Sequence, residues 1–342
     1  MDKVYGVMLI GCGHIGEDHL ADIYYRDNIH IVAVVDIDDK RAKLFQKKYN
    51  ADHWGTDYRE FLDLPELDIV IIATYVNTHL SILKDCVAAH KHVLCEKPIA
   101  ATREEGREFY KVAKNADVKV LVAHILRYNA TYEKICDLIW NGEIGELKVA
   151  RMSQNHHALN WPRYKRLLED CSPILDCGIH YMDIIQWFTG SKIREVMGYG
   201  TTVDTDLDPG VVNYGMIVMR LQNGGMAYYE AGWGQTFSSA NVKEFIGTKG
   251  RIRLTMNAQR GTDCEMGDRI ELFRLSTGET ETINVQCKYK DMYRQLCGLI
   301  DMIEGRPTRA PDIEQVYSAF KVAVAADKAV RESANVIVED NW

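Results

Sequence analysis

Residues 4–16 read VYGVMLIGCGHIG. The continuous apolar run from Val4 to Ile10 predicts a strand buried on both faces. Three glycines then follow in the spacing Gly-x-Gly-x-x-Gly, and residues 14–26 have the pattern of a helix. A buried strand, a glycine-rich turn and a helix in this order predict a dinucleotide-binding unit, in which the N-terminus of the helix faces a pyrophosphate.

The alternation of short apolar runs and helical stretches continues to residue 123. Thr102 and Glu105 form a capping box that should start the last helix of this series. The expected strands are Ile31–Val35, Ile69–Ala73, His92–Cys95 and Val118–Ala123, and the expected helices are 14–26, 38–49, 78–89 and 102–115. This order predicts a doubly wound parallel sheet of the α/β class over residues 1–123.

The pattern changes after residue 123. Helices are expected at 128–141, 173–188, 290–304 and 312–332, and residues 193–286 have mostly strands with glycine-rich turns. We therefore expect residues 124–342 to form a second, α+β domain with a large, mainly antiparallel open sheet and helices on one face. Its exposed face should carry Met216, Val218, Tyr228 and Trp233 in alternation. An open apolar face of this kind predicts self-association.

Composition narrows the class of protein. The 342 residues carry a net charge of −8, and 46% are hydrophobic, as in an ordinary globular chain. The acidic balance argues against nucleic acid or an anionic membrane surface as a partner. Nine scattered cysteines without a Cys-x-x-Cys pair, and no signal-like start, predict reduced thiols in a cytoplasmic protein.

Asp36 indicates which dinucleotide is bound. It ends the second expected strand, 20 residues after Gly16. A carboxylate there accepts hydrogen bonds from the adenosine ribose hydroxyls and repels a 2′-phosphate, so NAD is expected rather than NADP. The plainer alternative is a glycine-rich turn beside a solvent-facing Asp. Arg41 is expected on the exposed face of the next helix rather than on a phosphate.

Two further motifs carry groups suited to acid–base chemistry. Glu96-Lys97-Pro98 follows a buried strand, where ligands bind in a doubly wound sheet, and Lys97 beside a positive nicotinamide would suit proton relay. Asp176 and His180 are four residues apart, so they share one helix face, and Gly178 is expected to leave room for a ligand. The simpler alternatives are a surface lysine and a helical ion pair.

The three motifs, in this order, resemble the glucose–fructose oxidoreductase/inositol dehydrogenase/rhizopine-catabolism (Gfo/Idh/MocA) family over nearly the whole chain. His124–Asn129 and Gly142–Gly145 also look like this family. Thr74 and His79 match its cofactor loop, although Tyr75 and Val76 replace the usual Pro-Asn. The resemblance implies Lys97, Asp176 and His180 as the catalytic set. Cofactor contacts are then expected from Gly11, Cys12, Gly13, His14, Ile15, Gly16, Asp36, Ile37, Thr74, His79, Glu96 and Lys97.

The expected function is NAD-dependent hydride transfer between NAD and a ring secondary alcohol of a sugar, sugar derivative or inositol. His180 is the candidate base and Lys97 would stabilise the alkoxide, although the two roles can be exchanged. Trp161 is expected to pack against the ring, and no metal is expected, since His156 and His157 on a strand point to opposite faces. The expected substrate ligands are Lys97, Arg127, Asn129, Asn155, His156, Tyr164, Asp176 and His180.

Two alternatives stay open at this point. The same fold hosts enzymes that oxidise a glycoside, eliminate a group and return the hydride, with no net reduction of NAD. A non-catalytic module that binds NAD or a sugar is the third class, which the presence of Lys97, Asp176 and His180 disfavours. The resemblance also implies a homodimer or homotetramer formed through the sheet of the second domain.

Overall fold

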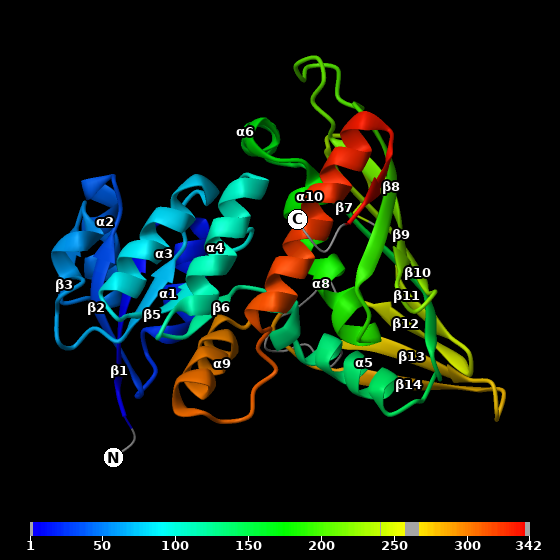
Figure 1. Cartoon of the computed structure of the whole chain (residues 1–342), viewed down its shortest axis with the longest axis horizontal. Helices are drawn as coiled ribbons and strands as arrows, with labels where there is room; N and C mark the ends of the chain where they lie inside the picture. Colours follow the sequence, from blue (N-terminus) through cyan, green and yellow to red (C-terminus); the bar gives the residue numbers. More distant parts are fainter. Residues whose placement is uncertain (1–2, 240, 257–266, 339–342) are drawn as a thin grey trace. The chain divides into compact units, whose positions relative to one another are not determined.

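The computed structural model describes residues 3–239, 241–256 and 267–338. Cys264, one of the nine cysteines, lies outside these ranges. The chain forms two compact units (Figure 1). The first unit comprises Met1–Tyr128 and Lys290–Tyr317, and the second comprises Asn129–Tyr289 and Ser318–Trp342.

The first unit contains a six-stranded parallel sheet with the order β3-β2-β1-β4-β5-β6. Its strands are β1 (Tyr5–Ile10), β2 (Ile29–Val35), β3 (His53–Gly55), β4 (Ile69–Ile72), β5 (His92–Cys95) and β6 (Val120–Val122). Every residue of β1 and β4 is buried, as their unbroken apolar runs require. The strand order reverses between β1 and β4, so the expected doubly wound sheet is confirmed, with its ligand-binding crevice at the carboxyl ends of these strands.

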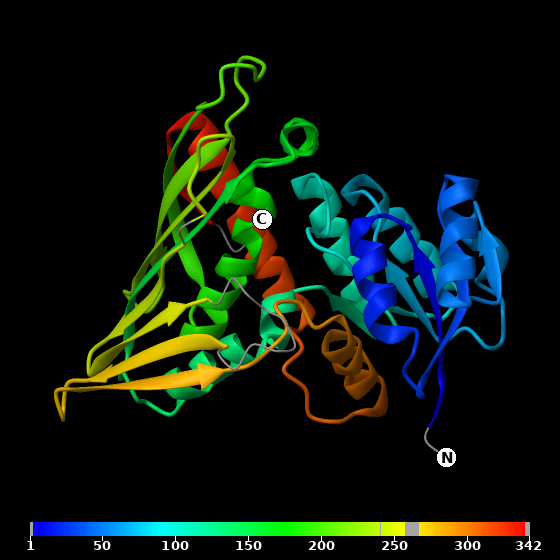
Figure 2. The same ribbon diagram turned by 180° about the vertical axis from the view of Figure 1, so that it is seen from behind.

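Helices cover both faces of this sheet. Figures 1 and 2 show α3 and α4 on one face and α1 and α9 on the other. The helices of the first unit are α1 (His14–Ile23), α2 (Asp39–Tyr49), α3 (His79–Ala88), α4 (Arg103–Asn115), α9 (Met292–Glu304) and the short turns η1 (Tyr58–Phe61), η2 (Val76–Thr78) and η3 (Ile125–Tyr128). Thr102 is the N-cap of α4 as expected, because its hydroxyl accepts from the Glu105 N–H at 3.3 Å and donates to the Glu105 carboxylate at 3.1 Å.

The helix α9 returns to the first unit after the whole sheet of the second. Leu296, Leu299 and Ile300 are buried in the same core cluster as β1 and β2. The division of the sequence at 123/124 placed this helix with the second domain. The difference arises because an amphipathic pattern shows that one helix face is buried, but not which core buries it.

The second unit is built on a nine-stranded sheet with the order β14-β13-β12-β11-β7-β10-β9-β8-β15. All pairs are antiparallel except β7 with β10, which confirms a large, mainly antiparallel sheet. The strands are β7 (Leu147–His157), β8 (Ile193–Thr201), β9 (Tyr214–Leu221), β10 (Met226–Gly234), β11 (Lys243–Gly247), β12 (Gly250–Thr255), β13 (Asp268–Arg274), β14 (Glu279–Val285) and β15 (Asn335–Ile337).

The helices of the second unit pack on one face of this sheet, as Figures 1 and 2 show for α5, α8 and the end of α10. They are α5 (Ala130–Trp140), α6 (Trp161–Asp170), α7 (Pro173–Asp176), α8 (Gly178–Thr189) and the last part of α10 (Ile313–Glu332). We did not expect α6 from the sequence pattern. Pro162 stands in its first turn, where a missing N–H leaves no helical hydrogen bond unmade.

The other face of the sheet carries apolar side chains that none of the described helices covers. Met197, Tyr199, Met216, Val218 and Met226 are between 37% and 57% exposed. The expectation for Trp233 was wrong, because its side chain is only 2% exposed. Tyr228 pairs with Val218 on the open face, and Trp233 lies an odd number of residues further along β10, so it faces the helices.

Within the described ranges, no helix has both the length and the apolar composition needed to cross a membrane.

Candidate active site

The glycine loop between β1 and α1 is closely packed at two of its three glycines. Gly11 has φ +101°, and a Cβ there would lie 2.4 Å from the carbonyl oxygen of Ala73 at the end of β4. A Cβ on Gly16 would lie 2.0 Å from the carbonyl oxygen of Gly11. The fold itself therefore requires glycine at both positions.

Gly13 differs from Gly11 and Gly16, because a Cβ there would meet no atom of the chain within 4 Å. Gly13 is also the N-cap of α1, and no side chain caps the N–H groups of the first turn. Open space beside uncapped N–H groups at a helix N-terminus fits an anion such as a pyrophosphate. The loop therefore fits NAD, with Gly13 as the point of close approach. His14 is exposed, Ile15 is half-buried and Cys12 is buried in this loop.

Asp36 is fixed at the end of β2 beside the glycine loop. Its Oδ2 accepts from the N–H of Cys12 at 2.8 Å and its Oδ1 accepts from the N–H of Asp38 at 2.9 Å. These bonds orient the carboxylate, whose negative charge is suited to ribose hydroxyls. Next to it, the Ile37 side chain is 91% exposed, so an apolar surface is available to a bound base. Arg41 is exposed and pairs with Asp38 at 3.5 Å, as expected for a surface residue.

His79 connects the ends of β4 and β5. Its Nδ1 lies 3.0 Å from the carbonyl oxygen of Pro98, and its Nε2 lies 3.2 Å from the carbonyl oxygen of Thr74. Burial lowers the pKa of His79, although the contacts with both carbonyls oppose the shift. His79 thus holds the two loops in a fixed relation. In the loop after β4, where Tyr75 and Val76 replace the usual Pro-Asn, the Tyr75 side chain is 72% exposed.

Glu96 at the end of β5 is held by a histidine from α1. His19 Nε2 lies 2.8 Å from Glu96 Oε1, and His19 is fully buried. Burial alone would raise the pKa of Glu96, but the His19 hydrogen bond and nearby positive charge lower it below its ordinary value. Lys97 follows, half-buried, and the Lys97–Pro98 peptide bond is cis.

The predicted cofactor residues of the first unit therefore share one edge of its sheet. The glycine loop follows β1, Asp36 and Ile37 follow β2, Thr74 and His79 follow β4, and Glu96 and Lys97 follow β5. Because these strands are parallel neighbours, their carboxyl ends lie side by side.

In the second unit, Asp176 ends α7 and His180 lies in the first turn of α8. Cys177 between them has helical dihedrals, so the turn stays helical. Asp176 and His180 are half-buried, whereas Cys177 and Gly178 between them are buried. This exposure pattern fits two side chains on one helix face. Gly178, however, serves packing rather than ligand access, because a Cβ there would lie 3.1 Å from the ring of Tyr229 on β10.

His156 and Tyr164 lie near Asp176 on the helix-covered face of the sheet. His156 Nδ1 is 3.1 Å from the Tyr164 hydroxyl, and the Tyr164 ring packs edge-on to Trp233 at 5.6 Å between centroids. Burial lowers the pKa of His156, while the charge of Asp176 opposes the shift. Trp161 packs against the same cluster and donates its indole N–H to Asp206 at 2.9 Å. The second unit therefore offers polar groups beside an aromatic wall.

Three other predicted substrate residues do not contact the His156–Tyr164 pair in the hydrogen bonds described here, and each has partners of its own. Asn129 caps α5: its oxygen accepts from two N–H groups and its amide donates to the carbonyls of Lys288 and Tyr289, which uses its full hydrogen-bonding capacity. Asn155 faces the open side of the sheet, opposite to His156, and donates to Glu230 at 2.9 Å. Arg127 is buried in the first unit and donates to Gln315 at 2.9 Å.

Lys243 is a residue of this region that sequence reasoning missed. It is only 2% exposed, its ammonium bonds to the carbonyl of Ser153, and it lies 4.7 Å from the centre of the Tyr181 ring. Burial lowers the pKa of Lys243 to about 7. The available signal was its even spacing from Phe245, since both residues point inward from β11. Nowhere in the described part of the chain do three or more His, Cys, Asp or Glu side chains form a metal-binding group.

Two family models match the chain. Residues 5–124 match the oxidoreductase family with an NAD-binding Rossmann fold (Gfo/Idh/MocA), and residues 132–253 match the Gfo/Idh/MocA C-terminal domain. Together these matches cover more than half of the sequence and parts of both compact units.

Curated relatives and solved structures agree with these matches. The chain is 25% identical to myo-inositol 2-dehydrogenase of Thermotoga maritima over 338 residues, which cover 97% of this chain and 98% of the relative. It is 26% identical to human trans-1,2-dihydrobenzene-1,2-diol dehydrogenase over 72% of this chain and 73% of the relative. The scyllo-inositol dehydrogenase of Lactobacillus casei, solved with bound NAD(H) and scyllo-inositol, has the same fold, with a TM-score of 0.80, 21% identity and coverage of 98% and 99%.

Gly13→Ala and Gly16→Ala test whether Gly13 serves cofactor binding and Gly16 serves packing of the fold. Gly13→Ala should leave the thermal midpoint of the cofactor-free protein unchanged and weaken NAD binding at least about tenfold, a loss of about 1.4 kcal/mol, because the new methyl occupies the ligand's space. Gly16→Ala should lower the thermal midpoint itself. Calorimetry of both variants measures each quantity, and full NAD affinity in Gly13→Ala would contradict this role.

Asp36→Asn tests the preference for NAD. The amide keeps the size of the side chain and an oxygen for the Cys12 N–H, but removes the charge that repels a 2′-phosphate. The ratio of NADP to NAD affinity should rise by about tenfold or more, equivalent to at least about 1.4 kcal/mol. Titration of wild type and variant with both cofactors measures it. Tighter binding of NADP than NAD by the wild type would show that the role of Asp36 is misassigned.

Proposed function

Because the chain belongs to the Gfo/Idh/MocA oxidoreductase family, whose first domain is an NAD-binding Rossmann fold, we propose that it oxidises a ring secondary alcohol with NAD. The substrate class is a sugar, a sugar derivative or an inositol. The observation that carries the proposal is the end-to-end match to myo-inositol 2-dehydrogenase, because it spans the cofactor motifs of the first unit and the Asp176–His180 turn of the second.

Lys97, Asp176 and His180 are the proposed catalytic residues. Oxidation of a carbinol removes a hydride from carbon and a proton from the hydroxyl, and NAD supplies the hydride acceptor when it is bound. His180 takes the hydroxyl proton, since an imidazole titrates near neutral pH. Lys97 stabilises the negative charge that develops on the oxygen, and Asp176 orients the hydroxyl.

His156 and Tyr164 are the proposed ligands of the other ring hydroxyls. Both carry groups that donate and accept hydrogen bonds, and the neighbouring Trp161 and Trp233 form an apolar wall. A polyol ring has hydroxyls at its edge and C–H groups on its faces, so it needs both kinds of surface. Asn129 and Asn155 are left out of this set, since one caps a helix and the other faces the open side of the sheet.

A second copy of this chain is the proposed partner of the open sheet face. Its exposed apolar residues, such as Met216 and Val218, occupy alternate positions along β9. Burying such a face between two copies removes apolar area from water, which favours association. A homodimer or homotetramer would result.

Light scattering at micromolar concentration tests this partner. The wild type should have at least twice the mass of one chain, and Val218→Glu should lower the mass, because a buried carboxylate opposes association. Leu44→Glu is the matched control, since Leu44 is 61% exposed on α2 of the first unit. A monomeric wild type, or an equal loss of mass in both variants, would contradict the proposal.

An activity screen with inositols, aldoses, uronates and glycosides tests the function. Absorbance of NADH should rise with at least one ring polyol. Lys97→Met should lower turnover roughly 10²–10³-fold while NAD still binds, as is usual for loss of one group that stabilises a developing negative charge. Lys84→Met, which removes an exposed lysine of α3 paired with Glu108, is the control.

Three outcomes of this screen would contradict the proposal. Cleavage of a glycoside without net NADH would indicate transient use of the cofactor. Binding of polyols without turnover would indicate a non-catalytic module. Activity confined to linear alcohols or 2-hydroxy acids would exclude the ring substrate.

A further inference from the structure

The helix α6 is attached to the second unit by few buried side chains. It connects β7, which carries His156, to α7, which ends at Asp176. Among its described side chains only Leu168 is buried, whereas Arg163 and Arg166 are exposed. Figures 1 and 2 show α6 apart from the helices that pack on the sheet. A helix with so little buried surface opens locally at low cost unless other contacts hold it.

The loop between β8 and β9, residues 202–213, gives α6 a fixed support. Two buried polar side chains, Asp204 and Asn213, lie at its base. Asn213 Nδ2 donates to Asp204 Oδ2 at 2.7 Å and to the carbonyl oxygen of Trp233 at 2.8 Å. Asp204 Oδ1 in turn accepts from the N–H of Gln235 at 3.2 Å. These bonds connect the base of the β8–β9 loop to β10 and the residue after it, so the base is placed independently of α6.

Asp206 in the β8–β9 loop binds two side chains of α6 that lie one turn apart. Its Oδ2 accepts from the indole N–H of Trp161 at 2.9 Å and lies 3.4 Å from Lys165 Nζ. The Lys165 ammonium also donates to the backbone carbonyl oxygen of Asp206. Residues four apart in a helix lie on the same side, so one carboxylate can bind both. Asp206 thus connects the first turn of α6 to the anchored loop.

One face of α6 carries part of the aromatic wall of the candidate site. Trp161, Tyr164 and Leu168 have the spacing i, i+3 and i+7, which places them on one side of a helix. Leu168 is buried in one hydrophobic cluster with Cys177, and Trp161 and Tyr164 pack against this cluster. Cys177 directly follows the proposed catalytic residue Asp176. The face of α6 therefore packs against the turn that carries the proposed catalytic groups of the second unit.

The β8–β9 loop and β7 contribute to the same cluster. Leu207 and Val211 of the loop pack against it together with Tyr164. The Tyr164 hydroxyl lies 3.1 Å from His156 Nδ1, and the Tyr164 ring lies 5.6 Å from the ring of Trp233. A movement of α6 away from the loop would separate Tyr164 from both partners.

We propose, on the basis of the function proposed above, that Asp206 is a positioning residue: it holds α6 in place and so sets Trp161 and Tyr164 beside the ring of the polyol. Asp206 acts through these two aromatic side chains. A wall that is in place before the substrate arrives does not have to be ordered on binding, so Asp206 lowers the KM for the polyol. Contacts with the remote part of the ring are equal in the ground state and the transition state, so they affect KM more than kcat.

Hydrogen–deuterium exchange of the substrate-free protein tests whether Asp206 holds α6, independently of activity. In Asp206→Ala both contacts of the carboxylate are lost. The backbone amides of residues 165–169 should then exchange about three- to tenfold faster, as expected for loss of hydrogen bonds of ordinary net strength. Asp206→Asn keeps an oxygen for the indole N–H and should recover part of the protection. Exchange at the wild-type rate in Asp206→Ala would overturn the proposal.

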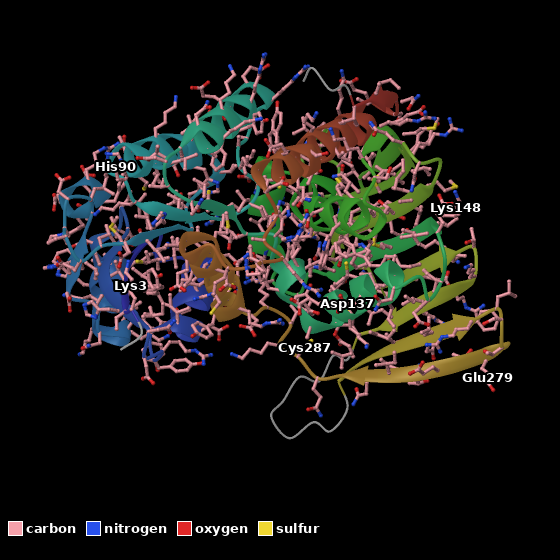
Figure 3. All side chains as sticks on the ribbon, turned by 60° about the horizontal axis from the view of Figure 1, so that its bottom comes forward. Lys3, His90, Asp137, Lys148, Glu279 and Cys287 are labelled. Carbon is pink, nitrogen blue, oxygen red and sulfur yellow. The ribbon has the colours of Figure 1, made fainter. Side chains whose placement is uncertain are left out.

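Two pairs of variants control this experiment. Asp208→Ala removes an exposed carboxylate two residues further along the same loop, and it should leave the exchange of α6 unchanged. Lys165→Met should also speed the exchange, because it removes the other partner of Asp206. Its control is Lys148→Met on β7 (Figure 3), since the two lysine side chains are 39% and 41% exposed and Lys148 pairs with Glu146. A control that exchanges as fast as its matched variant would contradict the proposal.

Steady-state kinetics with a ring polyol provide the second readout. Asp206→Ala should raise the KM for the polyol about three- to tenfold, keep kcat within about twofold and leave the KM for NAD unchanged. A general loss of structure would lower kcat and weaken the binding of both substrates, so this split distinguishes positioning from stability. Asp208→Ala should keep all three wild-type values. Faster exchange of α6 with an unchanged KM for the polyol would show that α6 is not a wall of the polyol site, which overturns the proposal.

The function proposed above and this inference can fail separately. If no ring polyol reduces NAD, the proposed function fails, and the exchange rates still decide whether Asp206 holds α6. If the wild type oxidises a ring polyol and Asp206→Ala does so with the same KM, only this inference fails.

Discussion

The contact between Gly16 and the carbonyl oxygen of Gly11 is the constraint on which the cofactor edge depends. It leaves no room for a Cβ, so α1 can begin directly after the turn that ends β1. The first N–H groups of the helix therefore emerge beside the carboxyl ends of β1, β2 and β4. A longer or looser turn would move them away from Asp36 and from the loop that carries Thr74.

Buried polar groups then fix the rest of that edge. His79 bridges the loops after β4 and β5, and His19 connects α1 to Glu96, the residue before Lys97. Each bond spans two elements, so a shift of α1 or of either loop would break a hydrogen bond in a low-dielectric setting, where such a loss is costly. In the second unit, burial in a low-dielectric setting likewise lowers the pKa of Lys243.

Much of this arrangement could be predicted from the sequence. The unbroken apolar runs of β1 and β4, the glycine spacing, Asp36 and the Thr102 N-cap each have a local physical cause, and each lies where expected. The return of α9 to the first core was not predictable, because burial of Leu296 and Leu299 depends on distant strands.

The contacts of single residues depend on distant structure in a similar way. An asparagine side chain suits both a ligand-binding site and a helix cap, and only the position of α5 shows that Asn129 caps a helix. The sheet face on which the side chains of Asn155 and Trp233 lie depends on their position along the strand. A shift of the register by one residue would move each side chain to the opposite face. Lys243 was overlooked because lysine is normally exposed, although its spacing from Phe245 placed it inside.

The most direct test of the account follows the hydrogen of the carbinol carbon. A ring polyol deuterated at that carbon is incubated with the protein and NAD, and the label is located by mass spectrometry. The account predicts deuterium in the reduced cofactor, in amounts equal to the ketone formed. Deuterium that returns to the carbohydrate without accumulation of reduced cofactor, or that appears only in water, would contradict it.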